Sequence, residues 1–310
     1  MENTRAKTTR NSLILLLTAT IWGMAFVSQS KGMDYMHPFT FNGVRSLIGA
    51  AGILLYILIS RKIAGDKAAK LDWKLNVKAG LLCGIFLTIA STLQQFGIKY
   101  TSVGKAGFIT TLYIIFVPMF GIFLKKKVAP VVWAAAGMAA VGMYLLCMTE
   151  SLRLGAGDIM VFLCAIAFAI QIMTVDHYAA RIDGAVVSCI QFTVCGVACC
   201  IGALIWGQPT FGQLQEGLGA LLYAGVLSCG VGYTLQIVGQ KGLNPTVAAL
   251  IMSLESVIAT ISGWIAYKIG FLTTDQTLTA RQIAGCVIVF AAVILVQLPP
   301  EWFRFGKKNT

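Results

Sequence analysis

The residues that could carry chemistry are charged and amide side chains embedded in long apolar runs. Glu255 is the acidic residue that lies well inside such a run, NPTVAALIMSLESVIATISGWI. At about 1.5 Å per helical residue it lies ~15 Å from the start of its helix, near the middle of a bilayer. Ionisable groups at that depth are costly and usually face a cavity or a partner. Glu255 is therefore expected to bind solute or a proton, or equally to make a structural hydrogen bond or ion pair.

Two basic residues also lie inside apolar runs. Arg45, in FNGVRSLIGA, is ~10 Å below the opposite membrane surface by the same helical rise. It is expected either to bind an anionic group or to pair with Glu255, with the pairing slightly favoured. Lys105 lies about one turn into its run among small residues. It is expected either to extend its ammonium group toward the interface or to line a cavity.

Amide and aromatic side chains complete the candidate solute-binding set. Amides inside membrane helices tie the helices together, each contributing ~0.6 kcal/mol, or contact solute. Aromatic rings either stack on solute or pack against neighbours. The candidates of both kinds are Gln94, Gln171, Gln191, Gln236, Trp22, Tyr113 and Tyr233. No metal or cofactor is expected, because the cysteines sit in apolar runs without histidine or acidic partners and fit as small apolar filler.

Composition indicates which elements must position these residues. Hydrophobic residues make up 57% of the 310 and charged residues 12%, whereas a soluble domain carries about 25% charged residues. Apolar runs of about 20 residues match a hydrocarbon core of ~30 Å. The fold class expected is an all-α integral membrane protein with ten transmembrane helices, near residues 13–31, 38–60, 77–98, 102–124, 129–148, 157–178, 184–206, 217–240, 245–267 and 281–298.

The net charge of +12 fits a membrane orientation better than nucleic-acid binding, because the basic residues fall between apolar runs. With the N-terminus inside, 17 of the 24 Lys and Arg residues fall on the cytoplasmic side, five fall outside, and Arg45 and Lys105 lie within spans. Cytoplasmic loops carry an excess of Lys and Arg. Both termini are therefore predicted to be cytoplasmic, in a bacterial plasma membrane.

The two halves of the chain resemble each other. LQQFGIKYTSVGKAGFITTLY from Leu93 aligns without gaps to LQIVGQKGLNPTVAALIMSLE from Leu235, an offset of 142. A weaker match near an offset of 146 brings Trp22 to Phe168 and Arg45 to Gln191. Chance agreement between apolar helices is the alternative. A unit of five helices is odd, so the second unit would enter the membrane with opposite polarity, as in many secondary transporters.

Several motifs together resemble the EamA-type members of the drug/metabolite transporter superfamily over about residues 12–298. They are TIWGMAF, FNGVRSLIGA, KYTSVGKAGFITTLYIIFVPMFGIFLKKKV, WAAAGMAAVGMYLL and NPTVAALIMSLESVIATISGWI. The resemblance implies two EamA-like five-helix repeats, assigned here to residues 1–148 and 149–310. It also implies transport of a small metabolite, amino acid or drug-like solute, with export the expected direction.

The chain departs from the family at one position. The ninth span commonly reads Leu-Glu-Pro in the family, but Ser256 follows Glu255 here. Only proline removes the backbone donor, so this span is expected to be less kinked. Pro118 is expected to kink the fourth span.

The function expected is secondary transport of a small-molecule solute across the lipid bilayer by alternating access. Exchange and facilitation stay open as alternatives, protons stay open as a coupled ion, and a channel is a weaker alternative. An enzyme is disfavoured, since HExxH and an acidic pair within a span are both missing. ATP-driven transport by this chain is disfavoured because GxxxxGK[ST] is missing. The residues do not distinguish a monomer from a homodimer.

Overall fold

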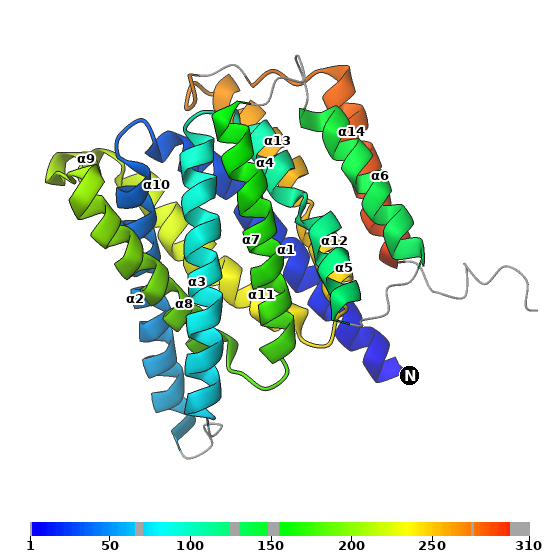
Figure 1. Ribbon diagram of the computed structural model, residues 1–310, viewed down its shortest axis with the longest axis horizontal. Helices are drawn as coiled ribbons and strands as arrows, with labels where there is room; N and C mark the ends of the chain where they lie inside the picture. The colour runs from blue at the N-terminus through cyan, green and yellow to red at the C-terminus, as the bar shows by residue number, and fades with distance from the viewer. Residues whose placement is uncertain (1, 66–70, 125–129, 148–154, 274–275, 298–310) are drawn as a thin grey trace, which may run out of the picture.

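The structure is a computed structural model that describes residues 2–65, 71–124, 130–147, 155–273 and 276–297. Over these residues the chain folds into a bundle of helices joined by short turns (Figure 1). Eight helical segments are long and apolar enough to cross a bilayer, and the shorter apolar helices α6 and α14 bring the bundle to the ten predicted segments. The all-α membrane fold predicted from the sequence is therefore confirmed.

The first half contains α1 (Glu2–Gly32), α2 (Pro38–Ala64), α3 (Trp73–Ile98), α4 (Val103–Thr111), α5 (Tyr113–Phe123) and α6 (Pro130–Cys147). The second half contains α7 (Ala156–Tyr178), α8 (Gly184–Gly202), η2 (Ala203–Gly207), α9 (Phe211–Glu216), α10 (Leu218–Leu222), η3 (Tyr223–Gly232), α11 (Tyr233–Gln240), α12 (Pro245–Met252), α13 (Glu255–Lys268) and α14 (Ala280–Gln297).

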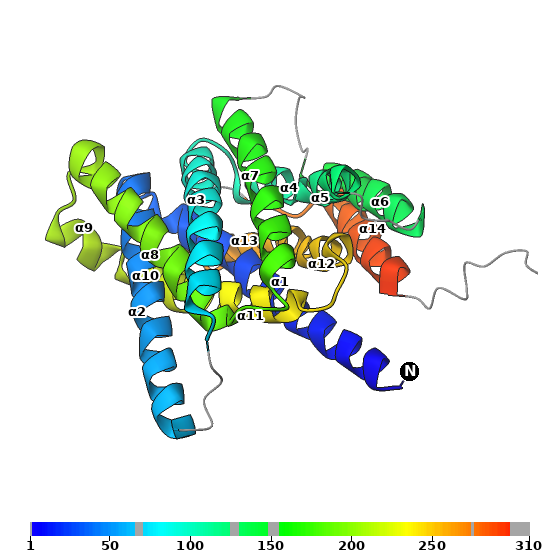
Figure 2. The ribbon, with the colours of Figure 1, turned by 60° about the horizontal axis from the view of Figure 1, so that its bottom comes forward.

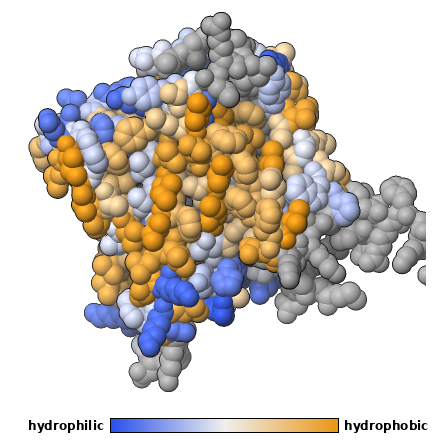
Figure 3. All heavy atoms as spheres, viewed as in Figure 1, coloured by the Kyte–Doolittle hydropathy of each residue, from blue (hydrophilic) through white to orange (hydrophobic). Residues whose placement is uncertain are grey.

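The surface of the bundle has the form that a bilayer requires. Large apolar side chains on several helices point outward, among them Leu55, Leu58, Ile205 and Val287. Figure 3 shows a broad apolar band on one face, with hydrophilic side chains gathered above and below it. We call the lower end in this view the basic side; the end of α2 and the turns after α7 and α11 lie there (Figure 1).

The two halves pack together through equivalent helices. Helix α2 packs against α8, its counterpart in the second half, and α6 packs against α14 in the same way. Helix α7 packs beside α3 (Figure 2), and α1 correspondingly packs against η3 and α11. Because each half crosses the membrane five times, the two halves run in opposite directions, as the inverted repeat predicted.

A pair of glycine contacts shows the same symmetry at atomic detail. A Cβ atom added at Gly97 would overlap the Val161 side chain on α7 and lie 2.8 Å from the Gly157 carbonyl oxygen. A Cβ atom added at Gly239 would lie 2.7 Å from Leu15 Cδ2 on α1. Gly97 and Gly239 are 142 residues apart, and Leu15 and Val161 are 146 residues apart. The contact of Gly97 with Val161 is therefore equivalent, by the two sequence offsets, to the contact of Gly239 with Leu15.

Two crossing segments are interrupted at equivalent places. Helix α4 ends before Leu112, and α12 ends before Ser253 and Leu254, 142 residues later. The ninth span is interrupted although serine stands where the family commonly has proline. The chain tightens there without proline, because Ser253 Oγ donates to the Leu250 carbonyl at 2.7 Å and Ser256 N donates to the Ser253 carbonyl at 3.1 Å.

The interruption in the fourth span also differs from the expectation. Pro118 lies inside α5, whereas the break occurs six residues earlier, at Leu112. The Leu112 amide donates to the Ile109 carbonyl at 3.2 Å, an i to i−3 bond that tightens the chain as a 3₁₀ turn does.

The eighth crossing segment departs from a regular α-helix. Its centre, η3, is wound as a π-helix for ten residues, a form that is rare and is often found at functional sites. Glycines allow close approach here. A Cβ atom at Gly225 would lie 2.9 Å from the Arg45 carbonyl oxygen, and one at Gly232 would lie 2.7 Å from Trp22 Nε1.

The repeated glycine contact leads to a matched prediction. Gly97→Ala and Gly239→Ala should each lower the free energy of unfolding in detergent by about 1–3 kcal/mol, because the added methyl group overpacks a helix crossing. Gly137→Ala is the control, since its Cβ atom would meet nothing within 4 Å. The control should be neutral or gain up to about 1 kcal/mol from helix propensity. The inferred equivalence fails if only one of the two buried positions is sensitive.

Candidate functional site

A small cavity lies where the two halves meet. Its water-accessible volume is ≈ 30 Å³. Helices from both halves contribute, with α1, α2, α3, α4 and α5 on one side and α7, η3, α11 and α13 on the other. The lining residues are Trp22, Ala25, Phe26, Gln29, Arg45, Gln94, Thr110, Tyr113, Phe168, Gln171, Ile172, Ser228, Tyr233, Gln236 and Glu255.

The structure brings most of the sequence-predicted site residues to this one place. Eight of the ten line the cavity: Trp22, Arg45, Gln94, Tyr113, Gln171, Tyr233, Gln236 and Glu255. A ninth, Gln191, stands directly behind the wall, where its Oε1 accepts from Gln171 Nε2 at 3.5 Å. The tenth, Lys105, lies elsewhere.

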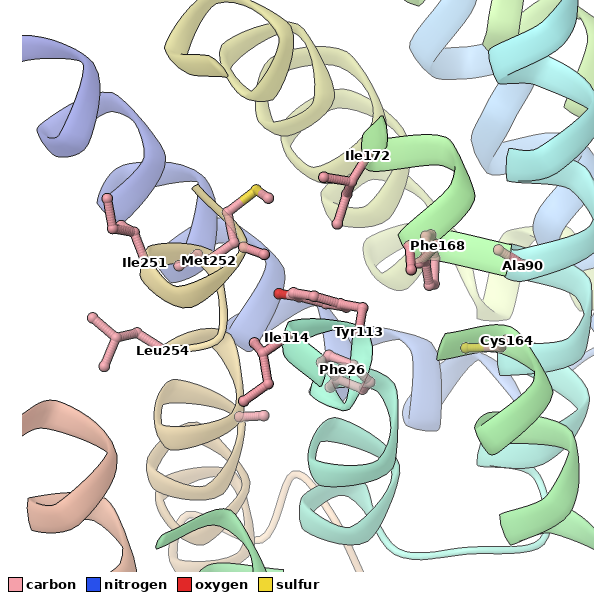
Figure 4. Packing of buried hydrophobic residues seen from close by; sticks show 14 of the residues in the cluster. Phe26, Ala90, Tyr113, Ile114, Cys164, Phe168, Ile172, Ile251, Met252 and Leu254 are labelled. Atoms are coloured by element: carbon pink, nitrogen blue, oxygen red, sulfur yellow. The ribbon is translucent and has the colours of Figure 1, made fainter. Parts of the chain in front are cut away.

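Glu255 and Tyr113 join the two halves across the cavity. Tyr113 is the first residue of α5 and Glu255 the first of α13, so each follows the interruption of its own segment. The Tyr113 hydroxyl donates to Glu255 Oε1 at 3.1 Å, and Glu255 is only 3% exposed. Figure 4 shows Tyr113 in the surrounding apolar cluster, with Phe26 and Phe168. The carboxylate therefore faces a polar partner and the cavity rather than lipid.

Arg45 does not make the ion pair with Glu255 that the sequence analysis slightly favoured. Its guanidinium lies over the Phe41 ring, 5.4 Å from the centroid, and it has no carboxylate partner within the described ranges. The Glu255 carboxylate accepts from Tyr113 instead. Arg45 is 5% exposed, and its Nε has no hydrogen-bond partner in the described part of the chain. Arg45 and Glu255 therefore line the same cavity without pairing with each other.

Amides make a hydrogen-bonded network along the walls. Gln236 Nε2 donates to Gln171 Oε1 at 3.2 Å, and Gln94 Nε2 donates to Thr110 Oγ1 at 3.2 Å. Each of the first two amides comes from a different helix of the second half. Such bonds satisfy polar groups that cannot form hydrogen bonds with water in a membrane interior. The network fixes the wall of the cavity.

Lys105 lies at the end of the bundle opposite the basic side and pairs with Asp158. Its Nζ is 2.6 Å from Asp158 Oδ2, and the Thr101 hydroxyl donates to the other carboxylate oxygen at 2.8 Å. The Gly155 amide also donates to Asp158, at 2.8 Å. Lys105 thus links the start of α4 to the start of α7, outside the cavity that the other candidates share.

Some lining residues were not among the sequence-predicted candidates. Gln29, Thr110 and Ser228 are polar, and Gln29 had a usable signal. It follows Trp22, Ala25 and Phe26 at spacings that put all four on one helix face. Phe168 was noticed only as the repeat counterpart of Trp22, and it lines the same cavity.

The cavity walls follow the sequence repeat. An offset of 142 relates Gln94 to Gln236 and Tyr113 to Glu255, and all four line the cavity. An offset of 146 relates Trp22 to Phe168, Ala25 to Gln171 and Phe26 to Ile172, which also line it. Equivalent positions of the two halves therefore line the cavity from both sides. That is where transporters with inverted repeats place their binding sites.

A central cavity at the junction of two inverted five-helix repeats is typical of one class of proteins, the membrane transporters built from inverted repeats. The chain matches the EamA-like transporter family twice, over residues 10–148 and 155–298, and it belongs to this family. It is therefore a membrane transporter of the EamA family.

Relatives across bacteria and archaea carry correspondingly general names. An "Uncharacterized transporter" of Archaeoglobus fulgidus is 27% identical over 92% of this chain and 84% of its own length. "Uncharacterized transporter YwfM" of Bacillus subtilis is 24% identical over 94% of each chain. A solved crystal structure matches 96% of this chain and 99% of its own with a TM-score of 0.73 at 16% identity, which shows a shared fold.

The position of Lys105 makes a testable distinction. Lys105→Met should lower the free energy of unfolding by about 2 kcal/mol, because Asp158 is only 4% exposed and loses its charged hydrogen-bond partner. Lys99→Met, at an exposed lysine nearby, is the control and should cost less than about 0.5 kcal/mol. Adding Asp158→Asn to Lys105→Met should restore part of the loss. Equal effects of the two lysine variants would argue against a stabilising pair.

Proposed function

We propose that the chain is a secondary transporter that carries a small solute through this central cavity by alternating access. The observation that carries the proposal is the pseudo-symmetric cavity, to which both repeats contribute equivalent positions. Because the halves are inverted, exchanging their conformations would open the cavity first to one side of the membrane and then to the other. At ≈ 30 Å³ the cavity has room for water-sized molecules, so solute entry requires the halves to move apart.

The interrupted segments support a site at this depth. In transporters with inverted repeats, broken helices near the midplane supply binding groups. Here the breaks before Tyr113 and Glu255 place both side chains at the cavity and bond them to each other. Separation of the halves would break this bond and free a hydroxyl and a carboxylate for solute.

The chemistry of the wall supports a solute with both polar and apolar parts. Buried polar atoms without a partner in the described residues include Trp22 Nε1, Gln29 Oε1 and Arg45 Nε. Aromatic surface is supplied by Tyr233, whose ring lies 4.5 Å from that of Trp22. An amino acid, another small metabolite or a drug-like compound fits such a wall. Export is the direction we propose, on the family resemblance.

The experiment that tests the proposal is flux into proteoliposomes from a panel of radiolabelled solutes. A carrier gives saturable flux that is accelerated by substrate on the opposite side. Flux that rises linearly with concentration would indicate a channel instead, and no flux for any solute on a broad panel would remove the support for transport through this cavity.

The role of Glu255 gives a specific prediction. Glu255→Gln keeps the size and the hydrogen-bonding capacity of the side chain and removes its charge. The variant should insert and fold, and solute flux should fall at least about tenfold, the equivalent of 1.4 kcal/mol in binding or barrier. Glu216→Gln on the short helix α9, an exposed position away from the cavity, should transport like the parent protein. Unchanged flux in Glu255→Gln would leave Glu255 a structural residue.

We also propose that the basic side faces the cytoplasm, on the excess of Lys and Arg there. In a cysteine-free background, a cysteine at position 181 should react with a membrane-impermeant maleimide only in inside-out vesicles. A cysteine at position 281 should react only in intact cells. Labels that reach position 181 from outside intact cells would reverse the orientation.

A further inference from the structure

A second pocket lies on the basic side and shares no residue with the central cavity. Its volume is ≈ 630 Å³. The end of α2, the turn after α7 and the end of α11 surround it. It is lined by Tyr56, Ile57, Ser60, Arg61, Ala64, Leu71, Asp72, Asn76, Ala180, Arg181, Ile182, Asp183, Gly184, Ala185, Thr234, Val238 and Lys241.

Three cations from three separate segments converge on this pocket: Arg61, Arg181 and Lys241. Lys241 Nζ donates to the Ile182 carbonyl at 3.1 Å, which holds the ammonium group at the rim. Two carboxylates also line the pocket, and both are engaged in capping helices. Asp72 accepts from the Leu75 amide at 3.0 Å, and Asp183 accepts from the Ala185 amide at 3.0 Å and the Val186 amide at 3.1 Å. The pocket therefore favours an anion.

An apolar groove of ≈ 450 Å³ leads away from the pocket toward the middle of the membrane. It runs between α2 and the η3–α11 segment. Small residues open it, because a side chain at Gly52 or Gly230 would otherwise fill the space. Its walls are completed by Gly49, Ile53, Tyr56, Val226, Val231, Thr234, Leu235 and Val238.

The pocket and the groove are continuous. Tyr56, Thr234 and Val238 line both of them. Along α2, the groove begins at Gly49 and the pocket reaches Arg61, a rise of ~18 Å at about 1.5 Å per residue. That length spans one leaflet of about 15 Å and reaches the headgroup level. The shape is that of a cleft with a basic mouth and an apolar tail.

We propose that this cleft binds an anionic phospholipid from the leaflet on the basic side. An acyl chain lies in the groove, and the phosphate accepts hydrogen bonds from the pocket. Arginine suits this role because its planar guanidinium can donate two parallel hydrogen bonds to a phosphate. Basic pockets between transmembrane helices are a known form of anionic lipid site. The π-wound η3 forms part of one wall, so the lipid would contact a segment that also lines the solute cavity through Ser228.

Native mass spectrometry of the full chain tests the proposal directly. The detergent-solubilised protein is incubated with equal amounts of phosphatidylglycerol and phosphatidylcholine of the same chain length, and retained lipid is counted. We expect about tenfold preference for phosphatidylglycerol, the equivalent of 1.4 kcal/mol. Equal retention of the two lipids would overturn the proposal, and this measurement needs no variant.

Matched variants locate the site. Arg181→Gln and Lys241→Gln should bring the two lipids to parity, whereas Arg281→Gln, whose guanidinium lies over the Tyr144 ring, should keep the preference. Gly52→Leu should fill the groove and reduce retention of both lipids. Gly137→Leu, at another helix glycine with open space around it, should not. Preference unchanged in both basic-pocket variants would overturn the assignment.

Two further outcomes would also count against a lipid site. If inorganic phosphate displaces the adduct and Gly52→Leu retains it, the pocket binds a free anion. If Arg181→Gln lowers solute flux while lipid retention is unchanged, the pocket belongs to the solute pathway. The lipid measurement stays valid if the chain proves to transport nothing, so it is separable from the proposed function.

Discussion

The absence of water from a bilayer interior is the constraint on which this structure depends. A buried amide, hydroxyl or charge in a membrane helix must find its partner inside the protein or face a water-filled space. The polar groups of this chain accordingly meet where its two halves join. Gln171 bonds to Gln236, and Tyr113 bonds to Glu255. Both bonds form part of the cavity wall, and the Tyr113–Glu255 bond also joins the two halves.

The two halves are equivalent in position and different in chemistry. Tyr113 occupies the place that Glu255 has in the other half, and Arg45 aligns with Gln191. The π-wound η3 likewise corresponds to a stretch of regular α-helix within α3. Exchanging the conformations of the halves would therefore give two states with similar shapes and different contacts. Their energies need not be equal, which allows one side of the membrane to be favoured.

Much of this arrangement was predictable from the sequence because the signals are local or periodic. Apolar run lengths predicted the crossing segments, and the 142-residue offset related Gln94 to Gln236. Gln29 could have been added from its helical face. Lys105 could not be placed, because its partner Asp158 comes from a helix more than 50 residues away. The break at Ser253 was missed because it arises from short hydrogen bonds rather than from proline.

The unpaired state of Arg45 is the strongest physical argument that the cavity is a binding site. Leaving a buried donor without a partner costs about 1–3 kcal/mol, and more when the group is charged. A fold selected for stability alone would pair Arg45 with Glu255 or replace both with apolar residues, which is often neutral or stabilising. Here Glu255 bonds to Tyr113, and Arg45 Nε has no partner in the described residues. The buried donors Arg45 Nε and Trp22 Nε1, both left without a partner in the described residues of one cavity, are costly for folding and suited to a solute that brings the missing partners.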